Sequence, residues 1–317
     1  MSESESTLRR FSDQQVYVHL VTAAAILWLL LTGMAITFAE YVPWILTLIG
    51  HQRLIFAHVV GGVALVTIGL YYVFYAVSGL ATGDFPTEWL PTLTTVREGF
   101  QFVKYVLGRG PKPESDKYTF IQKSEIIIVM AEITVLSVTG LLLTFPSLLV
   151  QYKPAFLIFS DVHALVAFTL LIGITYHLFD THIQHYPLER TMFTGKISVS
   201  EAREKYSRWV DPGGKRTDGG EVVAVDSDGI EIPVVGAVLA IFFFVMIYLG
   251  LLVRAVLSPL PTGEYVVGQL EPEGLLSGPL WVVFAVAFNL IALVLIASLV
   301  ALGYGMYIRF TERSDTT

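Results

Sequence analysis

Two histidines, His163 and His177, lie fourteen residues apart in one apolar segment that runs from about residue 156 to 179. At about 100° per residue they come back to within about 40° of one direction, so both fall on one face of a helix, roughly 21 Å apart along its axis. Ionisable residues inside a membrane are costly and usually functional, and imidazole is a common axial ligand of haem iron. The spacing favours a helix that binds two haems, one in each half of a hydrocarbon core about 30 Å thick.

The composition places the chain in a membrane. It is 54% hydrophobic and only 15% charged, and its mean hydropathy is +0.65. These values indicate an all-α membrane protein rather than a cytosolic one. Six apolar segments are long enough to cross a bilayer: residues 16–39, 55–80, 125–149, 156–179, 232–257 and 279–308.

The basic residues predict the orientation. Seventeen of the twenty Lys and Arg lie in the N-terminus, the loops 81–124 and 180–231, and the C-terminus. By the positive-inside rule both termini are cytoplasmic, which predicts a multi-pass protein of the cytoplasmic membrane. The chain has no cysteine, which excludes thiolate-bound iron–sulfur clusters, covalently attached c-type haem and disulfides within it.

A change of composition divides the chain. Residues 211–231 are acidic and Gly-rich, as is typical of a linker. Residues 1–210 before it hold all seven histidines and are predicted to form a four-helix dihaem bundle. Residues 232–317 after it are predicted to form a C-terminal transmembrane hairpin, which packs against the bundle, contacts an extracytoplasmic partner or simply adds anchoring.

The histidines sort by depth once the topology is set. His19 starts the first span at the inner side, and His58 starts the second at the outer side. His163 is near the outer end of the fourth span and His177 near its inner end. A haem b held by two imidazoles needs ligands at matching depth, so we expect His58 with His163 and His19 with His177. One histidine near a helix end is often an interfacial residue, but two matched pairs are harder to explain in that way.

Small residues close to these histidines fit a flat macrocycle. Side chains missing from a helix leave room beside its backbone, although small residues also serve ordinary helix packing in membranes. Both interpretations are open for Thr32-Gly33, Gly61, Gly62, Thr139-Gly140 and Gly173. His51, seven residues before His58, is a second candidate that we expect in the outer loop.

Several motifs have a familiar arrangement. They are Arg9-Arg10-Phe11, the thirty-nine-residue step from His19 to His58, the fourteen-residue step from His163 to His177, KYTFIQK at 117–123 and TMFTGKISVSEAREKYSRW at 191–209. Through them the chain resembles, over about residues 8–210, the cytochrome b (gamma) subunit of membrane-bound formate dehydrogenase.

The resemblance implies a role. Such subunits anchor an iron–sulfur subunit and a molybdenum- or tungsten-pterin catalytic subunit, and they pass electrons through two haems b to menaquinone or another quinone. The substrate chemistry is then on other subunits, and the partners are those subunits, membrane lipid and quinone, with no nucleic acid. The quinone site implied by the resemblance lies beside the inner haem and His177, at Thr119, Gln122 and Lys123. Asp180 and His182 are added to it because they follow His177 closely in the sequence. Thr119 stands where the family has an asparagine.

Three other functions stay open. The same kind of anchor could serve a thiosulfate, polysulfide or nitrate reductase or a hydrogenase. A proton-coupled transporter would use the histidines as a relay, but it predicts broken or inverted-repeat helices. A structural anchor without cofactors would leave the paired histidines unexplained.

Overall fold

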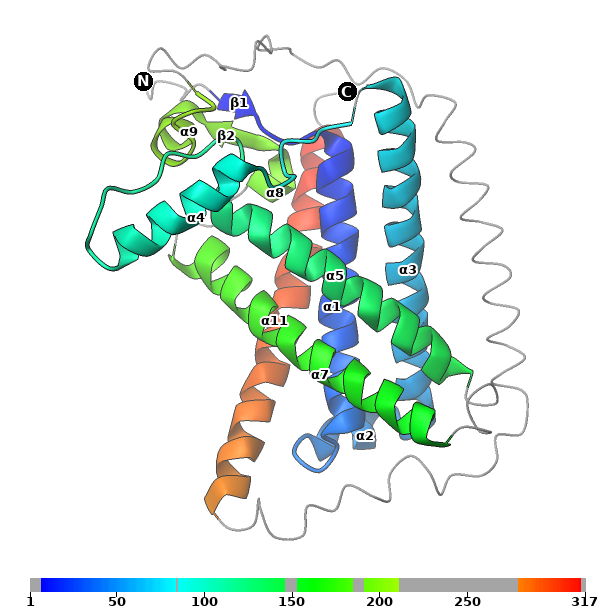
Figure 1. Ribbon diagram of the computed structural model, residues 1–317. Coiled ribbons are helices and arrows are strands. Elements are labelled where there is room, and N and C mark those ends of the chain that lie inside the picture. Colours follow the sequence, from blue (N-terminus) through cyan, green and yellow to red (C-terminus); the bar gives the residue numbers. More distant parts are fainter. Residues whose placement is uncertain (1–6, 84, 146–152, 185–190, 211–278, 315–317) are drawn as a thin grey trace. The chain divides into compact units, whose positions relative to one another are not determined.

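A computed structural model describes residues 7–83, 85–145, 153–184, 191–210 and 279–314. Five helices in it are long and apolar enough to cross a membrane. They are α1 (Asp13–Thr37), α3 (His51–Thr82), α5 (Phe120–Thr144), α7 (Lys153–Leu178) and α11 (Pro279–Ser314), all shown in Figure 1. These five match predicted spans to within a few residues. The predicted linker 211–231 and the span 232–257 lie outside the described residues.

The segments between the long helices contain short elements that were not predicted from the sequence. His51 is the first residue of α3, so the loop expected there is shorter, and a further short helix precedes it. A two-stranded antiparallel sheet is added to the predicted all-α fold. The short elements are β1 (Thr7–Arg9), α2 (Pro43–Ile49), α4 (Leu93–Val106), the π-helical turn η2 (Phe179–Gln184), α8 (Thr191–Thr194), β2 (Lys196–Ser198) and α9 (Val199–Lys205).

Capping boxes explain why two spans begin earlier than predicted. Before α1, the Ser12 hydroxyl accepts from the backbone N–H of Gln15, and the Gln15 side chain accepts from the N–H of Ser12. Before α5, Thr119 and Gln122 exchange the same two hydrogen bonds, each at 3.2 Å. Each box satisfies N–H groups that would otherwise lack a partner at a helix start. The helices therefore extend beyond the apolar runs used to predict them.

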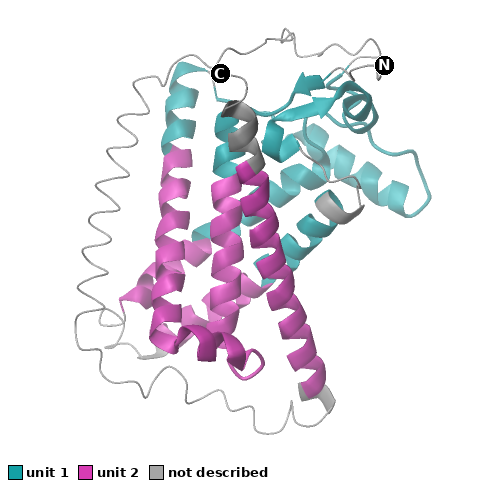
Figure 2. Cartoon of the chain, turned by 180° about the vertical axis from the view of Figure 1, so that it is seen from behind, with its two compact units in different colours: residues 1–19, 74–134, 169–233 teal, residues 20–73, 135–168, 234–317 magenta. Residues whose placement is uncertain are grey.

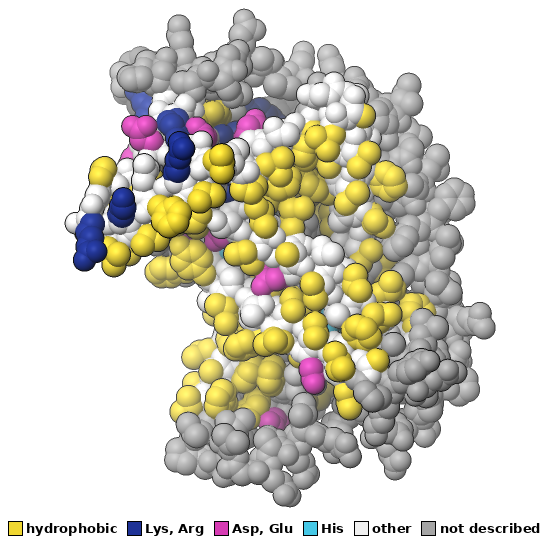
Figure 3. Space-filling view, in the orientation of Figure 1, with side chains coloured by type: hydrophobic (Ala, Val, Ile, Leu, Met, Phe, Trp, Pro, Cys, Tyr) yellow, Lys and Arg dark blue, Asp and Glu magenta, His cyan; other side chains and the backbone are white. Residues whose placement is uncertain are grey.

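The long helices present apolar side chains to their surroundings. Val77 of α3 is 61% exposed and Leu165 of α7 is 64% exposed. Figure 3 shows hydrophobic side chains spread over the visible face of the described residues. A soluble protein buries such surface, whereas a bilayer accepts it. The chain is a multi-pass membrane protein.

Two compact units divide the chain, and Figure 2 colours them separately. Unit 1 holds residues 1–19, 74–134 and 169–233, and unit 2 holds residues 20–73, 135–168 and 234–317. His19 and His177 therefore belong to unit 1, and His58 and His163 to unit 2.

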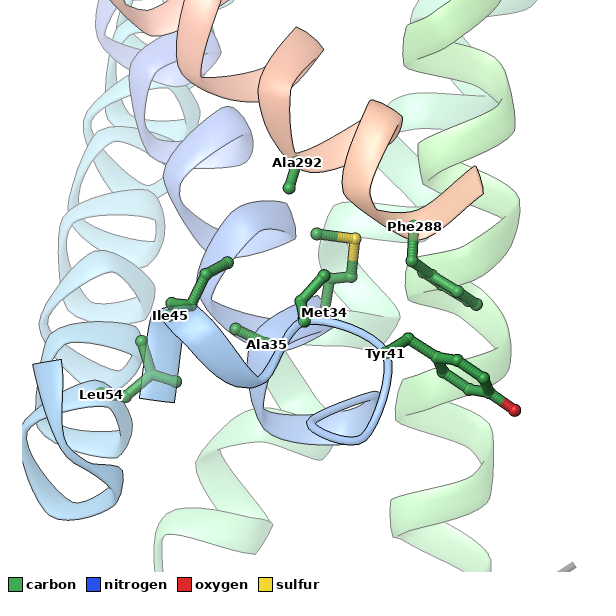
Figure 4. Packing of buried hydrophobic residues seen from close by; sticks show 8 residues of the cluster. Met34, Ala35, Tyr41, Ile45, Leu54, Phe288 and Ala292 are labelled. Carbon is green, nitrogen blue, oxygen red and sulfur yellow. The ribbon is translucent and has the colours of Figure 1, made fainter. Parts of the chain in front are cut away.

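The core of unit 2 packs α11 against the end of α1 and against α2. Phe288 stacks on Phe38 and Tyr41, with ring centroids 4.3 and 5.3 Å apart. Asn289 donates to the Tyr41 carbonyl and accepts from the Trp44 indole N–H, both at 2.8 Å. Figure 4 shows the buried cluster, which consists of Met34, Ala35, Tyr41, Val42, Ile45, Leu54, Phe288 and Ala292. Of the interpretations given for the C-terminal extension, packing against the bundle is the one that α11 follows.

In unit 1, the N-terminus is tied to the segment that follows α7. β1 pairs with β2 so that Leu8 faces Ile197. The Gly195 carbonyl then accepts from the backbone N–H groups of Arg10 and Phe11, at 2.8 and 3.1 Å. Gly195 has φ +73°, and a Cβ there would lie 2.6 Å from the Phe11 carbonyl oxygen. Only glycine fits both conditions without strain.

Arg10 joins three of the motif segments. Its guanidinium is buried, donates to the Lys117 carbonyl (2.9 Å) and the Gln122 side chain (3.1 Å), and lies 4.0 Å from the centroid of the Tyr206 ring. The Gln122 amide donates to the Tyr206 hydroxyl at 3.2 Å. A buried cation needs several acceptors and π faces to offset its lost hydration. Arg10 therefore holds the N-terminus, the start of α5 and the tail after α9 together.

Gly195→Ala tests this attachment. A forced positive φ costs about 1–2 kcal/mol and the close contact adds to it, so we expect the thermal midpoint of the purified protein to fall by about 4 °C. Limited proteolysis should also cut the N-terminal residues faster. Gly303→Ala is the matched control, because a Cβ there meets no atom within 4 Å. Equal midpoints for the two variants would contradict the role given to Gly195.

Candidate metal-binding histidine pairs

The structure brings His58 of α3 and His163 of α7 together within unit 2. Their ring centroids are 6.3 Å apart and their ring planes are 77° apart. This distance is within the range of edge-to-face ring contacts. The space between them is the right size for one atom that binds to both.

A threonine hydroxyl faces the Nδ1 atom of each of these two rings. Thr32 Oγ1 lies 2.8 Å from His58 Nδ1, and Thr139 Oγ1 lies 2.8 Å from His163 Nδ1. Each hydroxyl donates its proton to the carbonyl four residues earlier in its own helix, at 2.8 Å for Thr32 and 2.7 Å for Thr139. A hydroxyl that donates to its helix carbonyl can accept from the imidazole Nδ1–H, and in that tautomer the Nε2 lone pair is available to a metal.

A glycine next to each threonine gives the ring its space. A Cβ on Gly33 would lie 3.0 Å from His58 Cε1, and one on Gly140 would lie 3.2 Å from His163 Cε1. Alanine would press on the ring that the threonine holds. The Thr-Gly dipeptides of α1 and α5 thus contact a histidine of the next long helix in the same way. In each, the threonine hydroxyl faces the ring nitrogen and the glycine leaves space for the ring. The space beside Gly33 and Gly140 is taken by the imidazoles, so neither of the two roles considered from the sequence, macrocycle clearance or plain helix packing, describes these glycines fully.

The second pair lies in unit 1 and has the same spacing with a different support. His19 of α1 and His177 of α7 have ring centroids 6.3 Å apart and planes 52° apart. His177 Nδ1 lies 3.6 Å from a carboxylate oxygen of Glu125, near the start of α5. A carboxylate beside Nδ1 also favours a proton there and a free Nε2, and it makes the ring a stronger donor to a metal.

The spacing of both pairs fits one iron between two imidazoles. Two metal–nitrogen bonds of about 2.0 Å and two ring radii of roughly 1.1 Å separate opposite ring centroids by about 6.2 Å, close to the 6.3 Å of both pairs. The angle between the ring planes is free to vary, since each ring can rotate about its own bond to the metal. Among the described residues no three or more His, Cys, Asp or Glu gather at one point.

The remaining glycines divide between two roles. A Cβ on Gly61 would lie 2.7 Å from the Trp28 ring, so Gly61 serves the packing of α1 on α3. The Trp28 indole donates to the Ala57 carbonyl at 2.9 Å in the same contact. Gly62 and Gly173 have no atom within 4 Å of a Cβ position, so they leave open space beside their helices.

The predicted quinone residues lie at the start of α5 and beyond the end of α7. Thr119 and Gln122 are occupied by their capping box, and Gln122 also by Arg10 and Tyr206. The Lys123 side chain is buried at 4% exposure, and Asp180 is half-buried in η2. His182 belongs to η2 as well, but its side chain lies outside what the structure describes.

The sequence analysis missed Glu125 and the role of the two threonine hydroxyls. Glu125 falls near the inner end of the third predicted span, where it was not compared with His177. Both are expected at the inner side, so a depth comparison that included carboxylates could have linked them. The threonines carried a visible signal, the repeated Thr-Gly dipeptide, whose chemistry depends on which side chain faces it.

The sequence model described as prokaryotic cytochrome b561 matches residues 10–195, more than half of the chain. No curated protein matches the chain. The matched region contains both histidine pairs, both Thr-Gly dipeptides and Glu125. The family consists of membrane proteins that bind haem b and transfer electrons. This chain belongs to the prokaryotic cytochrome b561 family.

Proposed function

We propose that this protein is the membrane-anchoring dihaem cytochrome b subunit of a respiratory oxidoreductase complex. The observation that carries the proposal is the pair of matched imidazole couples, each with ring centroids 6.3 Å apart. One couple would be enough for a single haem, whereas two couples imply that electrons pass from one haem to a second. A structural anchor without cofactors leaves two such couples unexplained, and a proton-coupled transporter does not require its histidines to be paired.

The ligand assignment follows the two couples. His58 and His163 would hold the iron of one haem b, and His19 and His177 the iron of the other. A haem b bound on both sides by imidazole has no open position, so when bound it supplies one-electron transfer. The chain's own groups orient the ligands: Thr32 and Thr139 fix the rings of the first couple, and Glu125 faces one ring of the second.

The proposed electron route joins an iron–sulfur partner on the outer side to the quinone pool on the inner side. The chain has no cysteine with which to bind a cluster, so the partner must supply it. We place the quinone, menaquinone or a related one, beside His177, with Lys123 and Asp180 as the polar groups that contact it. His182 is a further candidate, while Thr119 and Gln122 support the site through the start of α5.

The catalytic partner is proposed to be of the formate dehydrogenase type, with a molybdenum- or tungsten-pterin subunit. The support is the resemblance of the N-terminal, inner-loop and tail motifs, which meet around Arg10. Purification of the complex from its native membrane, followed by metal analysis, tests this. Molybdenum or tungsten with formate-dependent haem reduction supports the proposal. Nickel with hydrogen-dependent reduction, or reduction by sulfur or nitrogen compounds, assigns one of the alternative partners.

Histidine variants test the two haem sites. Alanine at His58 or His163 should remove one haem, and alanine at His19 or His177 the other, because a single imidazole holds the group much more weakly. The measurement is haem per protein, from the pyridine haemochrome spectrum, together with redox titration. His51→Ala is the control and should keep both haems. Two full equivalents of haem in every variant would contradict the assignment.

The residues that contact the two histidine pairs, Glu125 and Thr139, can be tested separately. Glu125→Gln removes an anion beside His177, so the potential of that haem should rise, on the order of 50 mV, while the other haem is unchanged. Thr139→Val should alter only the haem of His163, through its potential and its low-temperature electron paramagnetic resonance spectrum. Thr134→Val is the matched control, since Thr134 also bonds its own helix, at 2.8 Å, but faces no histidine. Shifts of both haems in either variant would count against separate supports.

A variant of Asp180 tests the quinone site. Asp180→Asn should slow reoxidation of the reduced haems by a soluble menaquinone analogue about tenfold, because a proton acceptor beside the quinone is lost. Both haems should remain bound. Asp161→Asn, an exposed carboxylate of α7 in unit 2, should reoxidise at the normal rate. Normal reoxidation in Asp180→Asn would remove Asp180 from the site.

A further inference from the structure

Helix α4 carries an apolar face that the described part of the protein leaves uncovered. Leu93 is 81% exposed, Phe100 69% and Leu107 62%. Val96 and Val103, at 53% and 54%, complete a row with the spacing of one helix face. Figure 3 shows apolar side chains along α4 below a group of lysine and arginine side chains. A helix of fourteen residues is too short to cross a bilayer.

The opposite face of α4 is fixed by packing, so the helix cannot turn its apolar row inward. A Cβ on Gly99 would lie 2.7 Å from the ring of Phe120, the first residue of α5. Glu98 is buried and forms an ion pair with Arg208, whose guanidinium also lies 3.3 Å from Asp116. A buried ion pair is costly to break, because one charge would be left without its partner. The row is therefore held outward.

The charges beside the row are basic. Arg97 and Lys104 of α4 are exposed, and so are Arg109 and Lys112 just after it. The one acidic residue between positions 93 and 113 is Glu98, which faces inward. This segment is strongly basic in a chain of net charge −7. On a helical wheel Arg97 and Lys104 lie next to the apolar row, where long side chains can reach phosphate groups while the row is in acyl chains.

We propose that α4 is an interfacial helix that binds anionic lipid at the membrane surface. Its position supports lipid over a protein partner. α4 connects two membrane-spanning helices, α3 and α5, and its Gly99 packs against the ring of Phe120, the first residue of α5. The apolar row then lies at the depth of the acyl boundary and the basic residues at that of the headgroups. The proposal needs only that the chain spans a membrane, so it is independent of the haem assignment.

Single-cysteine labels test this, because the native chain has no cysteine to compete for the label. A spin label is placed at Phe100→Cys on the apolar row, and another at Gln101→Cys, an exposed position on the polar side. The purified full-length protein is reconstituted in nanodiscs that contain one third phosphatidylglycerol. We expect the Phe100 label to be at least about fivefold less accessible than the Gln101 label to a water-soluble nickel chelate, and more accessible to oxygen. Equal accessibility to nickel would overturn the proposal.

Two further measurements sharpen the result. Replacing Arg97, Lys104 and Arg109 together by glutamine should reduce the amount of phosphatidylglycerol retained around the protein. In nanodiscs of phosphatidylcholine alone, the amount of lipid retained should not differ between this variant and the native chain. Val103→Cys repeats the label on the same row in case the Phe100 variant does not fold, which circular dichroism checks. If the row is open to nickel in nanodiscs but protected in the native complex, a partner subunit covers it and the lipid proposal is wrong.

Discussion

An imidazole within a membrane protein has two ring nitrogens and little water to satisfy them, and the described site is organised around this constraint. In unit 2 each ring has one nitrogen matched to a threonine hydroxyl at 2.8 Å. While that hydroxyl donates to its helix carbonyl, it can accept from the ring Nδ1–H. In that tautomer the second ring nitrogen keeps its lone pair for a metal, and the other ring of the pair has its centroid 6.3 Å away. One local hydrogen-bond chain thus positions each ring and favours the tautomer that can bind a metal.

The two histidine pairs share a spacing but differ in support. The rings of unit 2 face neutral hydroxyls, whereas His177 of unit 1 faces the carboxylate of Glu125. A neutral acceptor positions a ligand and changes its electron donation little, while an anion raises that donation and stabilises the oxidised metal. Two sites with identical ligands can thus differ in potential through one residue outside the ligand set. The sequence analysis matched ligands by depth alone, so it contained no reason for the two sites to differ.

Features set by local sequence were predictable, and features set by contacts distant in sequence were not. Long apolar runs predicted the five described spans to within a few residues, and helical periodicity put His163 and His177 on one helix. Gly61 was correctly noted as important, but its neighbour is Trp28 rather than open space, and no local pattern contains that contact. The β1–β2 sheet joins residues about 190 apart in sequence, and its strands are too short to show a pattern of alternation. The motifs on which the resemblance rests meet in such distant contacts, around Arg10.

The contacts within those motifs also change the role expected for the predicted quinone residues. Thr119, Gln122, Arg10 and Tyr206 form one hydrogen-bonded cluster that sets the start of α5 and fastens the N-terminus and the tail. Gln122 gives its amide oxygen and nitrogen to this cluster, and the Thr119 hydroxyl oxygen accepts at the start of α5. Threonine, like asparagine, is a favoured N-cap residue, so residue 119 keeps a capping role. Under the proposed placement of the quinone, its polar contacts therefore come from Lys123 of α5 and Asp180 of η2, which lie outside the cluster.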